Sequence, residues 1–356
     1  NNILPIEDQF YDKKVEIPDY DFFSPEPVSD AIKLADIYHK AGFNDVEAKA
    51  GVHHGTYKVY VNFIPIADIT FLHPELFKNL YKESIRVNGI MYAAPNYLRM
   101  AMYLELSRPK GDVSRWEKVL KRISLLNKHY PLKGLDCLIE DIQRPFSVSE
   151  SKRVNPRHIF NTIRDSFVDQ GCVFFGAFAN SLYLNFNRKN IVDKVPDFDV
   201  LSEDPETSAI IVRERLTDLG IKRVTIKKYD AIGEVIPAHY TVSIHKDVVA
   251  FIYQTIACHS YNTKRSGNRT LRIATIDTML SFYLAFLYAD SPVYDVNRIL
   301  CMSENLFRIQ QQNRLKQTGV LKRFSIDCYG KPTTIQTIKS RRNTLHKELK
   351  KDRLSK

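Results

Sequence analysis

The stretch that decides the fold is IPDYDFFSPEP, residues 17–27. Aromatic side chains alternate in it with two carboxylates, so a β-strand over 19–23 would place Asp19 and Asp21 on one face. The Ser-Pro pair that follows ends the strand, and the next residues predict a helix over 30–41 that closes at a glycine. The stretch therefore predicts a strand–loop–helix unit that presents paired acids.

The same unit recurs later in the chain. Residues 195–205 read VPDFDVLSEDP, at an offset of 178 residues. Without a gap, 8 of 26 positions are identical between 18–43 and 196–221. Because one shift aligns both aspartates, both prolines and the terminal glycine, we interpret this as an internal repeat. The alternative is that two unrelated strand–loop–helix units have converged.

Each half of the chain predicts an α+β fold with a mixed sheet and flanking helices. In the first half, a strand is predicted over 46–50 and a long strand or strand pair, broken by Pro65, over 57–71. Helices are predicted over 95–106 and 114–129. The second half repeats this order, with strands at 173–175, 197–201, 223–228, 239–244 and 248–253 and helices at 207–219, 275–289 and 295–315. The predicted domains are 1–131, a linker at 132–150, a second domain at 151–319 and a basic tail at 320–356.

A third carboxylate, Asp68, lies inside an otherwise apolar strand. Burying an unpaired charge is costly, so such an acid normally has a cation or a hydrogen-bond donor as its partner. Two aspartates at i and i+2 repel each other unless a cation lies between them. Together Asp19, Asp21 and Asp68 predict a divalent-metal site, whereas Asp68 alone would suit a strand end that meets solvent.

The repeat provides an internal control for this site. Aligning Tyr57 with Tyr240 places Phe251 at the position of Asp68. A phenylalanine neither binds a metal nor accepts a proton, so the second copy is predicted to be inactive. Its remaining acids, Asp197 and Asp199, are expected to be solvated at a strand end rather than to hold an ion.

Charge and cysteine content limit the class of protein. The chain of 356 residues has a formal net charge of +11, which suits an acidic partner such as nucleic acid. Residues 1–150 carry −2, residues 151–319 carry +5 and residues 320–356 carry +8. The sequence contains no run of about 18 apolar residues, so it predicts no membrane-spanning helix.

The five cysteines are widely spaced and include no Cys-x-x-Cys pair, so they are expected to be reduced thiols in a reducing compartment.

These motifs resemble the nucleotidyltransferases of the DNA polymerase β superfamily. More narrowly, the residues Pro18 to Pro25, followed by Ala67-Asp68, resemble the catalytic poly(A) polymerases of poxviruses, African swine fever-type viruses and giant DNA viruses. The context on the following helices, Pro95-x-Tyr97-x-Arg99 and Arg115-Trp116, is similar too. The resemblance covers residues 1 to about 131 and, as a second and degenerate nucleotidyltransferase-like copy, continues to about 315.

The resemblance implies transfer of AMP from ATP to the 3′-hydroxyl of RNA, as in mRNA polyadenylation. Asp19, Asp21 and Asp68 would be catalytic residues that bind two Mg²⁺ or Mn²⁺ ions, with Asp68 as the proton acceptor or its neighbour. The expected partners are the RNA 3′ end and ATP, with a second copy or a processivity subunit besides. The expected location is the host cytoplasm, in a viral factory, and/or the virion.

One departure from the family concerns its glycine turn, which precedes the Asp-x-Asp strand. The second copy has a related turn at Gly176-Ala177, and the offset places the first copy's turn before residue 1. We therefore expect sequence to precede Asn1 in the full protein, because without that turn the nucleotide site would be incomplete.

Further candidates are weaker and each has a plain structural alternative. Residues that the resemblance and the charge pattern suggest for nucleotide binding are Tyr97, Arg99, Lys118 and Arg122, which would otherwise be core or solvated helix residues. Residues suggested for RNA binding are Tyr261, Lys264, Arg265, Arg269, Arg341 and Arg342, the last two in a basic tail that would otherwise be merely solvated.

Two other functions compete with polyadenylation. One is a non-catalytic RNA-binding or processivity scaffold built from two such copies, although a scaffold would not need Asp68. The other is a template-independent nucleotidyltransferase with a different nucleotide or acceptor, which the Asp-x-Asp pattern does not distinguish.

Overall fold

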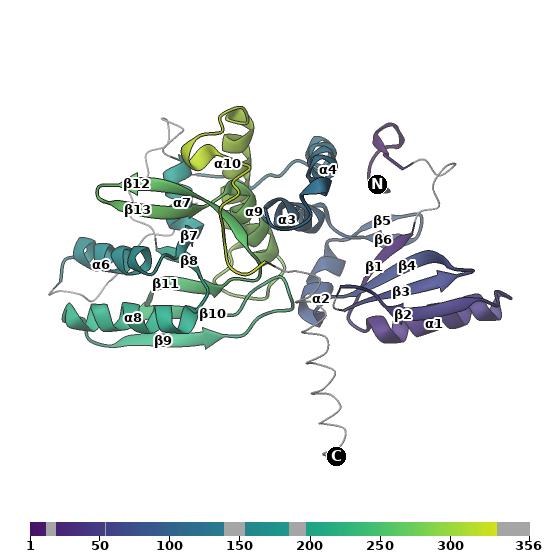
Figure 1. Cartoon of the computed structure of the whole chain (residues 1–356), viewed down its shortest axis with the longest axis horizontal. Helices are drawn as coiled ribbons and strands as arrows, with labels where there is room; N and C mark the ends of the chain where they lie inside the picture. The colour runs from purple at the N-terminus through teal and green to yellow at the C-terminus, as the bar shows by residue number, and fades with distance from the viewer. Residues whose placement is uncertain (12–18, 54, 139–153, 185–196, 333–356) are drawn as a thin grey trace, which may run out of the picture. The chain divides into compact units, whose positions relative to one another are not determined.

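The structure is a computed structural model, and it describes residues 1–11, 19–53, 55–138, 154–184 and 197–332 (Figure 1). These residues form two compact units, 1–94 and 95–332. Each unit contains a mixed sheet with flanking helices, which confirms the predicted α+β class. Within the described ranges, no helix has the length and apolar character needed to span a membrane.

The first unit is organised around a four-stranded sheet. Its strand order is β1 (Tyr20–Ser24), β4 (Ile64–Phe71), β3 (Thr56–Val61) and β2 (Val46–Ala50). β1 runs parallel to β4, and the other neighbours are antiparallel. Helix α1 (Pro27–Lys40) covers one face, where buried apolar side chains pack together: Ala31, Val59, Ala67 and Ile69. The opposite face of the sheet carries Asp21, Lys58, Asp68 and Thr70, together with Phe23.

The segment 57–71, predicted as a long strand or a strand pair, is a hairpin of β3 and β4, as the strand-pair alternative has it. Asn62 and Phe63 both have positive φ, at 50° and 65°, which is the conformation of a two-residue hairpin turn. Pro65 was expected to break the strand, but it lies inside β4. The rest of the unit consists of a 3₁₀ turn (Ile6–Asp8), helix α2 (Pro74–Lys82) and the hairpin β5 (Ile85–Val87) and β6 (Ile90–Tyr92).

The second unit contains an eight-stranded sheet. Its strand order is β14 (Cys328–Tyr329), β12 (His259–Ser266), β13 (Arg269–Ala274), β7 (Val173–Phe175), β8 (Phe198–Ser202), β11 (Asp247–Gln254), β10 (His239–Ile244) and β9 (Val224–Tyr229). β8 is parallel to β11, whereas β11–β10 and β10–β9 are antiparallel. The half β8–β11–β10–β9 therefore has the same order and directions as β1–β4–β3–β2 in the first unit.

Seven helices are described in the second unit. They are α3 (Pro95–Leu106), α4 (Trp116–His129), α6 (Pro156–Asp169), α7 (Gly176–Leu184), α8 (Pro205–Asp218), α9 (Ile276–Phe286) and α10 (Val296–Gln312). Every residue of α9 is buried. Helix α3 packs along α9, and the second compact unit includes both α3 and α4. The predicted domain boundary at residue 131 stays a prediction.

The first part of the predicted basic tail, residues 320–332, is integral to the second unit. Arg323 forms a buried ion pair with Asp277 of α9, and Asn262 donates to the carbonyl oxygens of Val320 and Lys322. β14 pairs with β12 at the edge of the sheet. This segment is therefore a strap across the unit rather than a free tail, and the rest of the tail, with Arg341 and Arg342, lies outside the described residues.

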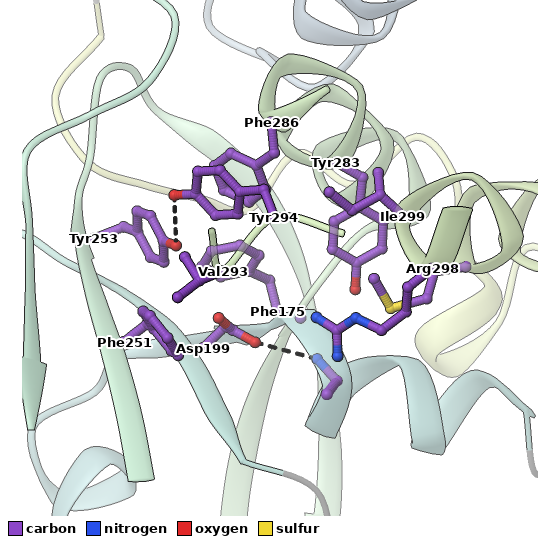
Figure 2. Close-up of a pocket in the computed structure, with 13 residues that line it drawn as sticks. Phe175, Asp199, Phe251, Tyr253, Tyr283, Phe286, Val293, Tyr294, Arg298 and Ile299 are labelled. Carbon is purple, nitrogen blue, oxygen red and sulfur yellow. Dashed lines mark hydrogen bonds between the residues drawn. The ribbon is translucent and has the colours of Figure 1, made fainter. Parts of the chain in front are cut away.

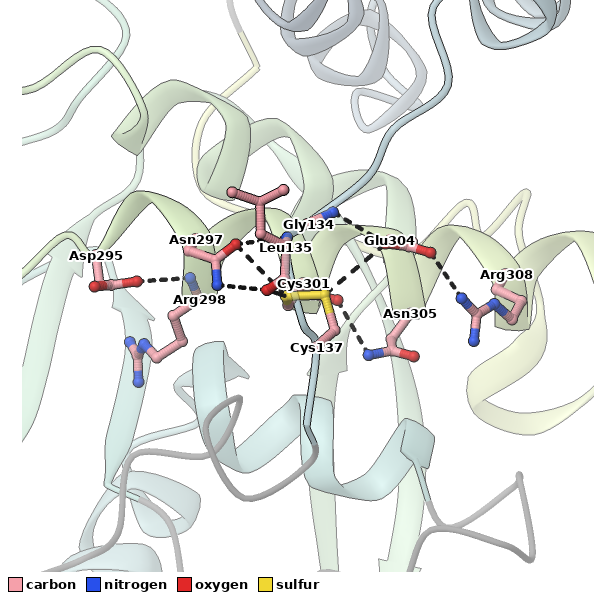
Figure 3. Close-up of a disulfide and its surroundings, with 10 residues drawn as sticks. All are labelled: Gly134, Leu135, Cys137, Asp295, Asn297, Arg298, Cys301, Glu304, Asn305 and Arg308. Atoms are coloured by element: carbon pink, nitrogen blue, oxygen red, sulfur yellow. Dashed lines mark hydrogen bonds and ion pairs between the residues drawn. A yellow bond between two sulfur atoms is a disulfide. The ribbon is translucent and has the colours of Figure 1, made fainter.

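Two disulfides contradict the expectation that the cysteines are unpaired. Cys137 is bonded to Cys301 of α10, and Cys258 is bonded to Cys328 of the strap, with Cα atoms 5.4 and 5.1 Å apart. Around the first bond, the amide of Gly134 donates to Glu304 (Figure 3). The paired cysteines are 164 and 70 residues apart, so their spacing along the chain gave no signal of pairing. The inference from these residues to a reducing compartment therefore does not hold.

Reduction of these disulfides is expected to lower the stability of the second unit. Each bond closes a long loop, and a native disulfide of this kind stabilises a fold by about 2–4 kcal/mol. Dithiothreitol should therefore lower the urea midpoint of the wild type. The double variant Cys137→Ser/Cys328→Ser, which lacks both bonds, should start lower and no longer respond to dithiothreitol. Equal midpoints for the oxidised and reduced wild type would contradict the prediction.

Candidate active site

A row of charged side chains crosses the polar face of the first sheet. Asp21 on β1 lies beside Asp68 on β4, Asp68 lies opposite Lys58 on β3, and Lys58 lies opposite Lys49 on β2. Register partners on neighbouring strands point to the same face of a sheet. Their neighbours along β3 and β4, Val59 and Ala67, point to the other face and are buried beneath α1. Asp21 and Asp68 therefore share the open face of the sheet.

Asp19 precedes β1 by one residue and alternates with Asp21, so the strand geometry directs both carboxylates to this face. Asp19 and Asp21 are exposed, and Asp68 is half-buried. Over the ranges that the structure describes, no three His, Cys, Asp or Glu side chains already converge as a metal cluster. The acids are oxygen donors of the type that Mg²⁺ and Mn²⁺ prefer, and Asp21 and Asp68 lie side by side in register.

Lys58 is the residue of this site that the sequence analysis missed. Its Nζ lies 2.6 Å from Oδ1 and 2.5 Å from Oδ2 of Asp68. Burial tends to lower the pKa of Lys58, but the hydrogen bond and charge of Asp68, with Tyr60 and Asp19, outweigh it and raise that pKa. Lysine is common on exposed strand faces, so only the cross-strand register shows that this one faces Asp68.

The second sheet carries an equivalent row in which the acid–lysine pair is absent. Asp199 on β8 lies beside Phe251 on β11, Phe251 lies opposite Thr241 on β10, and Thr241 lies opposite Lys227 on β9. The register therefore places Phe251 at the position of Asp68, in agreement with the sequence alignment. Thr241 takes the position of Lys58.

Asp197 and Asp199 were expected to be solvated, and this expectation is wrong. Asp197 is 2% exposed and Asp199 is half-buried. An oxygen of Asp199 accepts a hydrogen bond of 3.3 Å from the amide of Ala177, at the start of α7. The carboxylate lies so close to Gly176, whose φ is +62°, that a Cβ there would collide with it. In this copy an aspartate therefore covers the glycine turn.

A pocket borders this covered turn (Figure 2). Asp199 and Arg298 are among the residues that line it, together with six aromatic residues from the sheet and the α9–α10 region: Phe175, Phe251, Tyr253, Tyr283, Phe286 and Tyr294. Tyr253 and Tyr294 are linked through their hydroxyls at 3.1 Å, and the rings of Phe286 and Tyr294 stack. Burial is the main cause that raises the pKa of Tyr283. Aromatic side chains therefore surround the one acid, Asp199, that corresponds to Asp21 of the first sheet.

The candidates for nucleotide binding on α3 are core residues. Tyr97 is 4% exposed and packs edge-on against Tyr288. Arg99 is fully buried and donates to Asn127, to Asn96 and to the carbonyl oxygen of Tyr130, which ties α3 to the end of α4. Burial lowers the pKa of Arg99 to about 10. These contacts favour the structural alternative for both residues.

The remaining basic candidates lie on α4 and on the β12–β13 hairpin. On α4, Lys118 is exposed and Arg122 is half-buried one turn later. Arg265 is exposed near the hairpin tip, whereas Arg269 pairs with Asp169 of α6 at 2.6 Å. Residues with partial exposure complete the set: Tyr261, beneath the guanidinium of Arg272, and Lys264. A role of these residues in nucleotide or RNA binding stays a prediction.

Comparison with known proteins places this site in context. The family model of the poly(A) polymerase catalytic subunit matches residues 1–112, which include Asp19, Asp21, Lys58 and Asp68. A protein of African swine fever virus (strain Badajoz) named "Putative poly(A) polymerase catalytic subunit" is 30% identical over 199 residues. A protein of Acanthamoeba polyphaga mimivirus with the same name is 29% identical over 167 residues.

These matches cover 54% and 46% of this chain but only 38% and 28% of the two relatives, so the chain spans well under half of their length. A crystal structure of the Megavirus polyadenylate synthase resembles the fold with a TM-score of 0.75 and 21% sequence identity. That likeness extends over 97% of this chain and 70% of the Megavirus chain. Residues 1–112 thus carry the sequence signature of the poly(A) polymerase catalytic subunit family, which confirms the resemblance inferred from the Asp19–Asp21 strand.

Proposed function

We propose that this chain is the catalytic portion of a polynucleotide adenylyltransferase, which adds AMP from ATP to RNA 3′ ends. One observation carries the proposal: within the segment that matches the family, Asp68 lies in register with Asp21 on the open face of the sheet. The equivalent position of the second sheet holds Phe251, so the fold itself does not require an acid there. We infer that Asp68 is an acid because the proposed reaction needs a metal ligand at this position.

In this proposal, Asp19, Asp21 and Asp68 hold two Mg²⁺ or Mn²⁺ ions. When bound, such ions lower the pKa of an attacking hydroxyl and neutralise the charge of the triphosphate. The carboxylates contribute by binding and positioning, so no covalent enzyme intermediate is required. Asp68, which is less exposed than Asp19 and Asp21, is the proposed acceptor for the proton of the RNA 3′-hydroxyl.

The second nucleotidyltransferase-like copy, proposed as residues 151–319, would be degenerate and would support RNA retention. Phe251 replaces its third acid, and Asp199 covers its glycine turn. Residues 151–319 and 320–356 together hold the surplus positive charge of the chain, which suits the RNA backbone. A second copy of the chain or a processivity subunit would complete the assembly, in the host cytoplasm, a viral factory or the virion.

Primer extension with the full-length protein tests this function. An oligo(A) primer is incubated with Mg²⁺ or Mn²⁺ and each nucleoside triphosphate in turn, and products are resolved by length. We expect extension with ATP and little with the other three. Preferential uridylate addition would favour a different template-independent nucleotidyltransferase. RNA binding without any extension would favour the non-catalytic scaffold.

A further inference from the structure

The ion pair between Lys58 and Asp68 differs from an ordinary exposed surface salt bridge. It lies inside the acidic row, and the two side chains are only 29% and 19% exposed. The ammonium contacts both carboxylate oxygens, at 2.6 and 2.5 Å.

This geometry has a direct consequence for cation binding. An ammonium that contacts both oxygens takes one lone-pair site on each of them and so blocks bidentate binding of a metal on that side of the carboxylate. Two cations at that distance also repel each other. A divalent ion and the Lys58 ammonium therefore compete for Asp68.

Comparison with the second sheet distinguishes a role of Lys58 toward Asp68 from a general role in strand pairing. There, Lys58 and Asp68 are replaced together by Thr241 and Phe251. The outer lysine of the row behaves differently, because Lys227 occupies the position of Lys49. The inner lysine is thus present where the third acid is present and absent where that acid is absent.

We propose that Lys58 is a built-in counter-ion for Asp68, which holds this carboxylate in position when no metal is bound and which the metal must displace. Lys58 is a positioning residue, since it acts through Asp68. The proposal rests on the proposed function, because it takes Asp68 to be a metal ligand. The proposal predicts two effects of Lys58. It lowers the affinity of the site for metal, and it reduces the repulsion between the acids when no metal is bound.

Direct Mn²⁺ binding to the full-length protein tests the proposal without any turnover. Free Mn²⁺ is measured by electron paramagnetic resonance for the wild type, Lys58→Met and Lys49→Met, with Asp68→Asn as the ligand-deficient variant. Lys49 is the matched control, since it lies next in the row but pairs with Glu47. Lys58→Met should bind Mn²⁺ up to about fivefold more tightly than the wild type. Lys49→Met should bind as the wild type does.

Thermal unfolding is the second measurement, and it compares the melting temperatures of Lys58→Met and the wild type. Without metal, Lys58→Met should melt at a lower temperature than the wild type because its acids are unscreened, and saturating Mn²⁺ should remove that difference. Equal or weaker Mn²⁺ binding by Lys58→Met would overturn the proposal while leaving the metal site intact, provided that Asp68→Asn still loses binding. If Asp68→Asn binds Mn²⁺ as well as the wild type, the proposed metal site itself is wrong and this inference falls with it.

Discussion

Replacing Asp68 with Asn should lower the rate of AMP addition by about 1,000-fold or more, which corresponds to ~4 kcal/mol of added barrier. Asparagine keeps the size of the side chain but loses the negative charge that binds a metal and accepts a proton. Asp68 is held on β4 between Asp21 of β1 and Lys58 of β3. The measurement is the initial rate of primer extension at saturating ATP.

The matched control for this variant is Asp199→Asn, because Asp199 occupies the equivalent sheet position to Asp21 next to Phe251. Asparagine at 199 retains an oxygen that accepts the Ala177 amide. We expect Asp199→Asn to change the extension rate by less than about threefold, and both variants to keep the wild-type circular dichroism spectrum. A well-folded Asp68→Asn protein with a wild-type rate would remove Asp68 from the mechanism.

The acidic strand and its repeat were readable from the sequence because they depend on local periodicity. Alternation over 19–23 places two acids on one face, and a constant offset of 178 carries the pattern into the second copy. The alignment also put Phe251 opposite Asp68, and the strand registers agree with it. Register follows from the alternation of buried and open residues, which the sequence displays directly.

What the sequence did not reveal depends on contacts between distant segments. The two disulfides join residues 164 and 70 positions apart. Tyr97 and Arg99 follow a family-like motif, yet the packing of α3 on α9 buries both. The partner of Lys58 is 10 residues away across a hairpin whose turn was not recognised. In each case a tertiary contact determines the role of a residue that looks ordinary in the chain.

The strap at 320–332 shows the same limitation and offers the strongest test of stability. By composition it is the start of a basic tail, but Arg323 donates to both carboxylate oxygens of Asp277, at 3.2 and 2.9 Å. The Asp277 side chain is 1% exposed and that of Arg323 is 14% exposed. Gln310 of α10 also donates to Asp277. The charge of Asp277 is therefore buried and depends on the arginine of the strap.

Arg323→Met should destabilise the protein by about 3–5 kcal/mol, because it leaves the Asp277 carboxylate buried without its cation. Methionine preserves most of the length and apolar contact of the side chain, so the loss reports mainly on charge. Arg308→Met is the matched control: Arg308 pairs with Glu304 on α10, but it is 53% exposed, and an exposed pair contributes under about 1 kcal/mol. Urea unfolding followed by fluorescence gives both values.

The double variant Arg323→Met/Asp277→Asn should recover part of the loss, since no uncompensated charge remains. A loss from Arg323→Met no larger than that from Arg308→Met would show that the strap is held by its disulfide and strand pairing rather than by this ion pair.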